Sequence, residues 1–105
     1  MFEGSKDAKI LFVSDFLRSK EVESGSVLAG ERRDILVNAL NSAGVLASDY
    51  AFTTIHETAA KGNKVTGFDR DERIASQRRC KELINESKAN VIVPLGDYAL
   101  KFITG

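Results

Sequence analysis

Residues 90–100 decide the fold of this chain, and they read Asn90-Val91-Ile92-Val93-Pro94-Leu95-Gly96-Asp97-Tyr98-Ala99-Leu100. The short apolar run in their first half is typical of a buried strand in a parallel sheet. A glycine turn follows this strand and leads directly into a predicted helix. Because ligands of parallel α/β sheets bind at the carboxyl ends of the strands, we expect a functional site at this junction.

Composition narrows the classes of protein to consider. The 105 residues suffice for one domain, residues 1–105, and 43% of them are hydrophobic, which is enough for a core. The 15 basic residues balance 15 acidic ones, so any binding of nucleic acid must depend on local patches. A single cysteine excludes an internal disulfide and an all-cysteine metal site.

The chain lacks the sequence signals of a membrane or secreted protein. No apolar run approaches the roughly 20 residues of a membrane span. Residues 1–9 have mixed charge and no apolar core like that of a signal peptide. We therefore expect a cytoplasmic protein, or a piece of one, with no membrane partner.

Strands and helices are predicted to alternate along the chain. The predicted strands span residues 8–14, 49–55 and 90–95, and the predicted helices span residues 31–43, 71–87 and 97–103. Polar connections are predicted over residues 16–30 and 56–70. This alternation implies parallel pairing with right-handed crossovers, and so an α/β fold. Pro94 removes a donor within the third strand, which must therefore be an edge strand or end its pairing there.

Three single residues are candidates for chemistry, and each has a structural alternative. Asp15 follows the first strand, where α/β proteins place catalytic carboxylates, but an aspartate there can equally cap a helix. His56, the one histidine, is either an acid–base group or a structural residue at the end of the second strand. Cys80 lies on the apolar side of its predicted helix, as expected of a buried structural thiol.

Basic residues of the predicted loops are the better candidates for contacts with phosphate. Arg18, Lys20, Lys61 and Lys64 would flank the carboxyl-end face of the sheet. The basic residues on the predicted helices indicate solvated faces: Arg32, Arg33, Arg78, Arg79 and Lys81. The chain has no G-x-x-x-x-G-K-[ST] loop, and no G-x-G-x-x-G follows the first strand. We expect no cofactor and no bound metal.

Six short segments of the chain can be compared with known family motifs by their order and spacing. They are Ser14-Asp15-Phe16-Leu17-Arg18, Gly25-Ser26-Val27-Leu28-Ala29-Gly30, Ser42-Ala43-Gly44, Phe52-Thr53-Thr54, Gly62-Asn63-Lys64 and residues 90–100. In order and spacing they resemble motifs of the uracil-DNA glycosylase superfamily, most closely of its iron–sulfur branch. Those motifs are G-E-x-P-G, G-R-P-F-V-G, E-A-G, I-T-N, G-N-R and K-V-I-V-x-L-G-x-x-A-L, and the last is the most specific match.

The resemblance implies both a fold and a site. The implied fold is a three-layer α/β/α sandwich with a short parallel sheet of strand order 2-1-3. Asp15 stands at the family's water-activating glutamate and is shorter by one methylene, so it is the implied catalytic residue. The resemblance also implies base-pocket residues and contacts with the DNA backbone: Phe16, Leu28 and Thr54 for the pocket, and Arg18, Lys61, Asn63 and Lys64 for the backbone.

Departures from the family pattern point to weakened chemistry. Leu28 replaces the phenylalanine that stacks on the flipped uracil, and Thr54 replaces the asparagine that reads its edge. Thr58 and Ser76 stand at two positions of the cluster cysteines. The chain ends at Gly105, before the family's last strand and its H-P-[ST] loop, so we expect a fragment of a longer polypeptide.

We therefore expect a degenerate glycosylase-like module that binds DNA, with weak or no hydrolysis of the N-glycosidic bond. Such domains are fused to the N-terminus of some bacteriophage DNA polymerases, so the resemblance also implies a replication polymerase in the host cytoplasm. Two other classes stay open: a small-molecule-binding α/β domain, and a protein-docking domain that dimerises through an exposed sheet edge. Salt-dependent binding of DNA would distinguish the first hypothesis from both.

Overall fold

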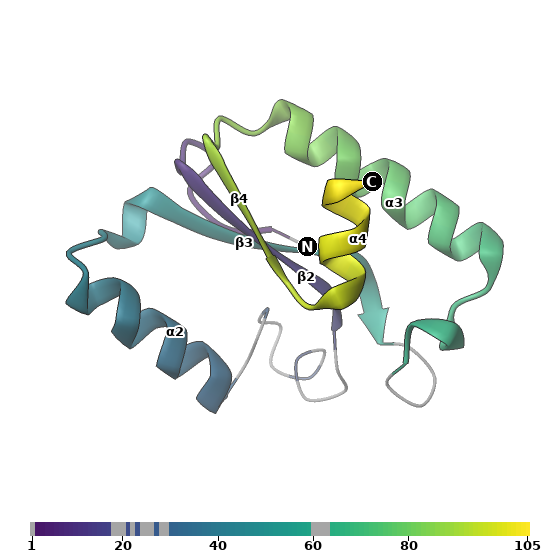
Figure 1. Cartoon of the computed structure of the whole chain (residues 1–105), viewed down its shortest axis with the longest axis horizontal. Helices are drawn as coiled ribbons and strands as arrows, with labels where there is room; N and C mark the ends of the chain where they lie inside the picture. Colours follow the sequence, from purple (N-terminus) through teal and green to yellow (C-terminus); the bar gives the residue numbers. More distant parts are fainter. Residues whose placement is uncertain (1, 18–20, 22, 24–26, 28–29, 60–63) are drawn as a thin grey trace.

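The computed structural model describes residues 2–17, 21, 23, 27, 30–59 and 64–105. Figure 1 shows the described elements arranged around one twisted sheet. In chain order these elements are β1 (Phe2–Gly4), β2 (Ile10–Leu17), α2 (Glu31–Ser42), β3 (Tyr50–Ala59), α3 (Arg70–Glu86), β4 (Val91–Leu95) and α4 (Asp97–Thr104). Two short 3-10 turns, Ala47–Asp49 and Val65–Gly67, precede β3 and α3.

The sheet has the strand order β1-β3-β2-β4. The central strand β2 pairs in parallel with β3 on one side and with β4 on the other. This confirms an α/β fold, but the predicted purely parallel sheet is incomplete, because β1 adds an antiparallel strand beside β3. Strand β1 has only three residues, which are too few to display an alternating pattern, so it was not predicted.

Helices lie on both faces of the sheet, α2 on one and α3 with α4 on the other (Figure 1). Side chains alternate along β2, so that Leu11 and Val13 join the core under α3 and α4. Phe12 points to the opposite core, where its ring stacks on Phe52 with 5.3 Å between centroids. Burial on both faces explains why β2 is a nearly continuous apolar run.

Two predicted boundaries are wrong. The segment from His56 was predicted as a polar loop, but β3 continues through it to Ala59. In the same way β2 extends through Phe16 to Leu17. The predicted first helix forms as α2, but it packs loosely on the sheet, since Ile35 is 63% exposed and α2 has no fully buried residue.

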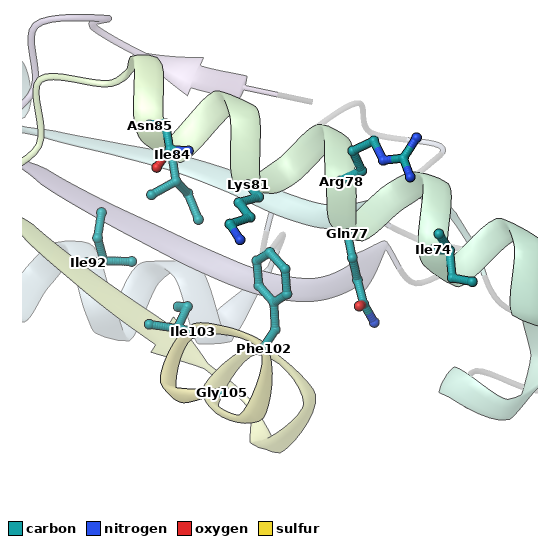
Figure 2. A pocket seen from close by; sticks show the side chains of 10 residues that line it. All are labelled: Ile74, Gln77, Arg78, Lys81, Ile84, Asn85, Ile92, Phe102, Ile103 and Gly105. Carbon is teal, nitrogen blue, oxygen red and sulfur yellow. The ribbon is translucent and has the colours of Figure 1, made fainter.

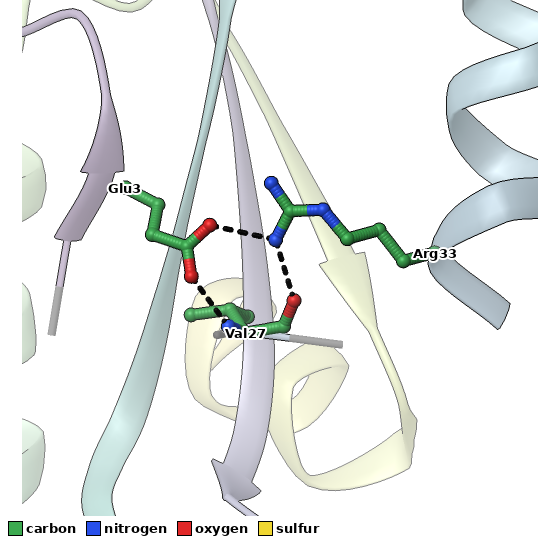
Figure 3. A network of polar contacts seen from close by, with 3 residues as sticks. All are labelled: Glu3, Val27 and Arg33. Carbon is green, nitrogen blue, oxygen red and sulfur yellow. Dashed lines mark hydrogen bonds and ion pairs between the residues drawn. The ribbon is translucent and has the colours of Figure 1, made fainter. Parts of the chain in front are cut away.

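A polar network holds α2 in place although its apolar contacts are few. Figure 3 shows Arg33 of α2 reaching across to β1, where its Nη1 lies 2.6 Å from Glu3 Oε2. The same nitrogen donates to the carbonyl oxygen of Val27 at 2.9 Å, and Val27 N donates to Glu3 Oε1 at 2.7 Å. The Arg33 guanidinium also lies 4.7 Å from the centroid of the Phe52 ring. The predicted solvated role of Arg33 is therefore wrong.

Pro94 explains why β4 can stand at the edge of the described sheet. Val91 N donates to the carbonyl oxygen of Lys9, so the backbone groups of Val91 face β2. Successive residues of a strand direct their backbone groups to opposite sides. Pro94 is three positions after Val91, so its nitrogen faces away from β2. The missing N–H is thus at a position where no partner strand lies, which confirms the predicted edge position.

Replacing Pro94 with valine is expected to increase self-association. The Pro94→Val variant regains an outward N–H on an edge strand and so offers a longer ladder to a second copy. Sedimentation velocity over a range of protein concentrations measures this change against the parent chain. Pro94→Lys is the matched control, because it restores the same N–H but adds a charge that opposes edge-to-edge pairing. Equal self-association of both variants and the parent would contradict the expectation.

No helix in the described part of the chain is long and apolar enough to cross a membrane.

Candidate functional site

The carboxyl ends of β2 and β4 meet around a small polar cavity. Its volume is about 110 Å³, below the roughly 300–1,000 Å³ of typical ligand pockets. The lining comes from β2, from the end of β4 with the glycine that follows it, and from two charged residues that lie between these strands in sequence: Ser14, Asp15, Phe16, Leu95, Gly96, Glu21 and Arg32. The structure thus has a cavity at the sheet edge where the sequence predicts a site.

Asp15 caps the last helix. Its Oδ1 accepts a hydrogen bond from the backbone N–H of Ala99 at 2.7 Å, and the N–H of Tyr98 also interacts with the carboxylate. These donors belong to the first turn of α4, where backbone N–H groups have no partner within the helix. Gly96 occupies the N-cap position and has no side chain to satisfy them. A carboxylate from another strand therefore performs the capping that a local serine or aspartate usually performs.

Gly96 makes this capping possible. Its φ of 129° lies in a region that side-chain-bearing residues rarely adopt. A Cβ placed on Gly96 would lie 2.5 Å from Asp15 Oδ2 and 2.8 Å from Oδ1. The absence of a side chain at Gly96 therefore lets the carboxylate approach the helix N-terminus.

The pKa of Asp15 is raised from its usual value. Burial is the main cause, and the nearby carboxylate of Asp97 adds to it. The hydrogen bonds from Ala99 and Tyr98 and the positive charge of Arg32 lower the pKa and so offset part of the shift. Arg32, which the sequence indicated as part of a solvated helix face, thus lines the cavity and acts on Asp15.

Of the predicted base-pocket residues, the structure describes Phe16 and Thr54, and Leu28 lies outside the described residues. Phe16 lines the cavity, and its ring meets that of Phe68 edge to face at 5.9 Å. Thr54 is in register with Ser14 on the neighbouring strand and is 2% exposed. Its Oγ1 has no hydrogen-bond partner within the described part of the chain, which is costly for a buried hydroxyl.

Most of the residues predicted to contact the DNA backbone lie outside the described part of the chain. Lys64 is described and exposed, whereas Arg18, Lys61 and Asn63 lie outside the described residues. Glu21 was missed by the sequence analysis, and it is a buried lining residue of the cavity. A charged residue in a polar stretch without periodicity carries no signal that it will be buried.

His56 is a buried member of a polar and aromatic cluster beside this edge. Its ring is 1% exposed and stacks on Phe68, with 3.8 Å between centroids and 6° between planes. Gln77 Nε2 donates to the Tyr98 hydroxyl at 2.9 Å, and this hydroxyl lies 2.9 Å from His56 Nε2. The hydroxyl can accept from Gln77 and still pair with either neutral tautomer of His56, either by donating its hydrogen to Nε2 or by accepting one from it.

The electrostatics of this cluster agree with a neutral imidazole. Burial is the main cause that lowers the pKa of His56 to about 4, and the positive charges of Arg79 and Arg73 contribute to this shift. Arg79 donates to the carbonyl oxygen of Ile55 at 2.7 Å, so its charge is fixed close to the ring. Of the two hypotheses for His56, the geometry favours the structural one, because the ring has almost no access to solvent.

The described residues do not form a metal or iron–sulfur site. No group of three or more His, Cys, Asp or Glu side chains converges anywhere in the described ranges. The one thiol, Cys80, is 1% exposed inside the core under α3, and burial raises its pKa to about 11. A cluster that needs several exposed thiolates therefore does not fit this chain.

Comparison with known proteins gives no assignment. Neither a protein-family model nor a curated protein sequence matches this chain. The chemistry of the carboxyl edge and the sequence motifs must therefore carry any functional proposal.

Proposed function

We propose that this chain is a uracil-DNA glycosylase-like module that binds DNA at the carboxyl edge of its sheet, with weak or no base excision. The observation that supports this most is the position of Asp15. It stands where the resemblance expects the water-activating carboxylate, yet it is bonded to the N-terminus of α4. A carboxylate held in this way keeps its place in the site but has less freedom to orient a water molecule.

The topology of the edge supports the same proposal. The sheet order β1-β3-β2-β4 differs from the predicted 2-1-3 order by the additional strand β1, and the parallel part β3-β2-β4 is what supports a glycosylase-like core. The β4–Gly96–α4 junction carries the most specific family motif, and it forms one wall of the cavity. In this proposal the domain belongs to a longer chain, such as a phage DNA polymerase, whose other domains are its partners.

The cavity supports binding over excision. A base that is flipped out of a duplex needs a fitted pocket, whereas this cavity has a volume of only about 110 Å³. Thr54 offers one hydroxyl where an asparagine would offer an amide donor and acceptor together. A site without such a paired contact discriminates poorly between bases.

Asp15→Asn is the variant that tests this proposal. An asparagine caps helices about as well as an aspartate, so we expect the free energy of unfolding to change by less than about 1 kcal/mol. We expect no release of uracil from single- or double-stranded uracil DNA by either protein, together with DNA binding that weakens as salt rises. Asp97→Asn is the matched control, because it removes a neighbouring exposed carboxylate from the same helix end.

Two outcomes would overturn parts of the proposal. Release of uracil by the parent and the Asp97→Asn variant, abolished in Asp15→Asn, would identify an active glycosylase. An absence of salt-dependent DNA binding would remove the DNA-binding function and favour a small-molecule or protein-docking role.

A further inference from the structure

A second hollow lies between α3 and α4, and it shares no lining residue with the cavity beside Asp15. This groove has a volume of about 740 Å³, several times that of the cavity beside Asp15. Figure 2 shows side chains from α3, β4 and α4 converging on it. The glycosylase-like proposal makes no use of this groove.

The floor of the groove is apolar. Ile84 of α3, Ile92 of β4 and Phe102 and Ile103 of α4 line it, and all four are half-buried. Each packs against the core under α3 and α4 on one side and is left uncovered on the side of the groove. Apolar side chains gathered at one concave place are typical of an interaction site.

The rim of the groove is positively charged. Figure 2 shows the Lys81 side chain extending toward Phe102, with Arg78 one turn away on the outer side of α3. Neither Lys81 nor Arg78 has an ion-pair partner among the described residues. No acidic side chain of the described part lines the groove, so its charge is not neutralised from within.

We propose that this groove docks an acidic amphipathic helix of a partner protein. Bulky apolar side chains at helical spacing would cover the floor, and carboxylates on the flank of the same helix would meet Lys81 and Arg78. Nucleic acid fits less well, because successive bases stack on aromatic side chains and the lining of this groove offers a single aromatic ring, Phe102, among aliphatic ones.

The edge of β4 explains why a helix fits better than an added strand. A strand that joined β4 would find Ile92 N–H as a donor, but Pro94 offers none at the next outward position. Strand addition depends on such main-chain hydrogen bonds, whereas a helix satisfies its own backbone. The incomplete ladder therefore favours binding through side chains in the groove.

Fluorescence anisotropy with two labelled peptides tests the proposal. Both are amphipathic helices with leucines at positions i, i+3, i+4 and i+7, and one carries glutamates where the other carries lysines. We expect the glutamate peptide to bind at least about tenfold more tightly than the lysine peptide. We expect Lys81→Glu to weaken binding of the glutamate peptide about tenfold, and Arg70→Glu on the same helix outside the groove to leave it unchanged.

Circular dichroism and thermal unfolding of both variants check that the exposed substitutions leave the fold intact. Equal affinity for the two peptides, or equal effects of Lys81→Glu and Arg70→Glu, would overturn the proposal. Displacement of the glutamate peptide by single-stranded DNA, in a way that Lys81→Glu abolishes, would assign the groove to nucleic acid instead. Self-association of the parent chain in sedimentation velocity, abolished by Lys81→Glu, together with no binding of the glutamate peptide, would assign it to a second copy. None of these results depends on whether the chain releases uracil.

Discussion

The Gly96→Ala variant is expected to lose about 3 kcal/mol of its free energy of unfolding. Holding alanine at the φ of 129° found for Gly96 costs about 1–3 kcal/mol. The added Cβ would also lie 2.5 Å from Asp15 Oδ2, so the carboxylate must move and its cap on α4 weakens, which costs about 1 kcal/mol more. Urea denaturation followed by circular dichroism measures the loss as a lower midpoint at an unchanged slope.

Gly44→Ala separates the two causes. Gly44 also has a positive φ, 79°, but a Cβ placed there meets no atom within 4 Å. We expect a loss of about 1 kcal/mol for this variant, from backbone strain alone. In an Asp15→Ala background, Gly96→Ala should cost less than it does in the parent, because the cap is already gone. Equal costs in both backgrounds would contradict a role for Gly96 in admitting Asp15.

Stability is expected to fall by about 2–3 kcal/mol between about pH 7 and about pH 4.5 because of His56. Burial lowers the pKa of His56 to about 4 in the folded chain, from 6.5 in the unfolded chain. Below about pH 6.5 His56 is therefore protonated in the unfolded chain, whereas in the folded chain it stays neutral until the pH approaches 4. This contribution is complete above the unfolded pKa and is lost as the pH falls toward the folded one.

His56→Phe is the control for this pH dependence. Phenylalanine can still stack on Phe68, but it cannot titrate, so the unfolding free energy of the variant should change much less over the same interval. The raised pKa of Asp15 acts in the opposite direction, since its contribution declines as the pH rises above the unfolded value. That contribution is present in both proteins, so the difference between them isolates His56. Parallel pH profiles would contradict the assignment of a neutral imidazole.

The elements that sequence could predict are those with their own periodic signal. The three parallel strands are recognised as short runs rich in apolar residues, and the helices α2, α3 and α4 by their length between these runs and by apolar residues at helical spacing. Strand β1 forms because β3 offers an edge to residues 2–4, and the partner of such a pairing is not visible locally. Strand β3 continues through the polar residue His56. The ring of His56 is accommodated there because it stacks on Phe68 and Tyr98, which lie far from it in sequence.

The candidate site was predicted in place but not in detail. The position of Asp15 at the end of a buried strand indicated the edge at which the cavity lies. Whether it serves chemistry or capping depends on Ala99, and no local pattern connects two residues so far apart. The role of Arg33 likewise depends on Glu3 and on the carbonyl oxygen of Val27, and no local pattern in the sequence connects it to them.

The cap on α4 also fixes an order of events during synthesis. Asp15 and Ala99 are 84 positions apart, so the carboxylate leaves the ribosome long before its donors exist. The eight residues of α4 are too few to hold a helix on their own, and they gain their cap only from a finished β2. The capping of α4 therefore waits until residues 97–104 have emerged, and until then the carboxylate of Asp15 on the central strand lacks the N–H donors that it meets in the folded domain.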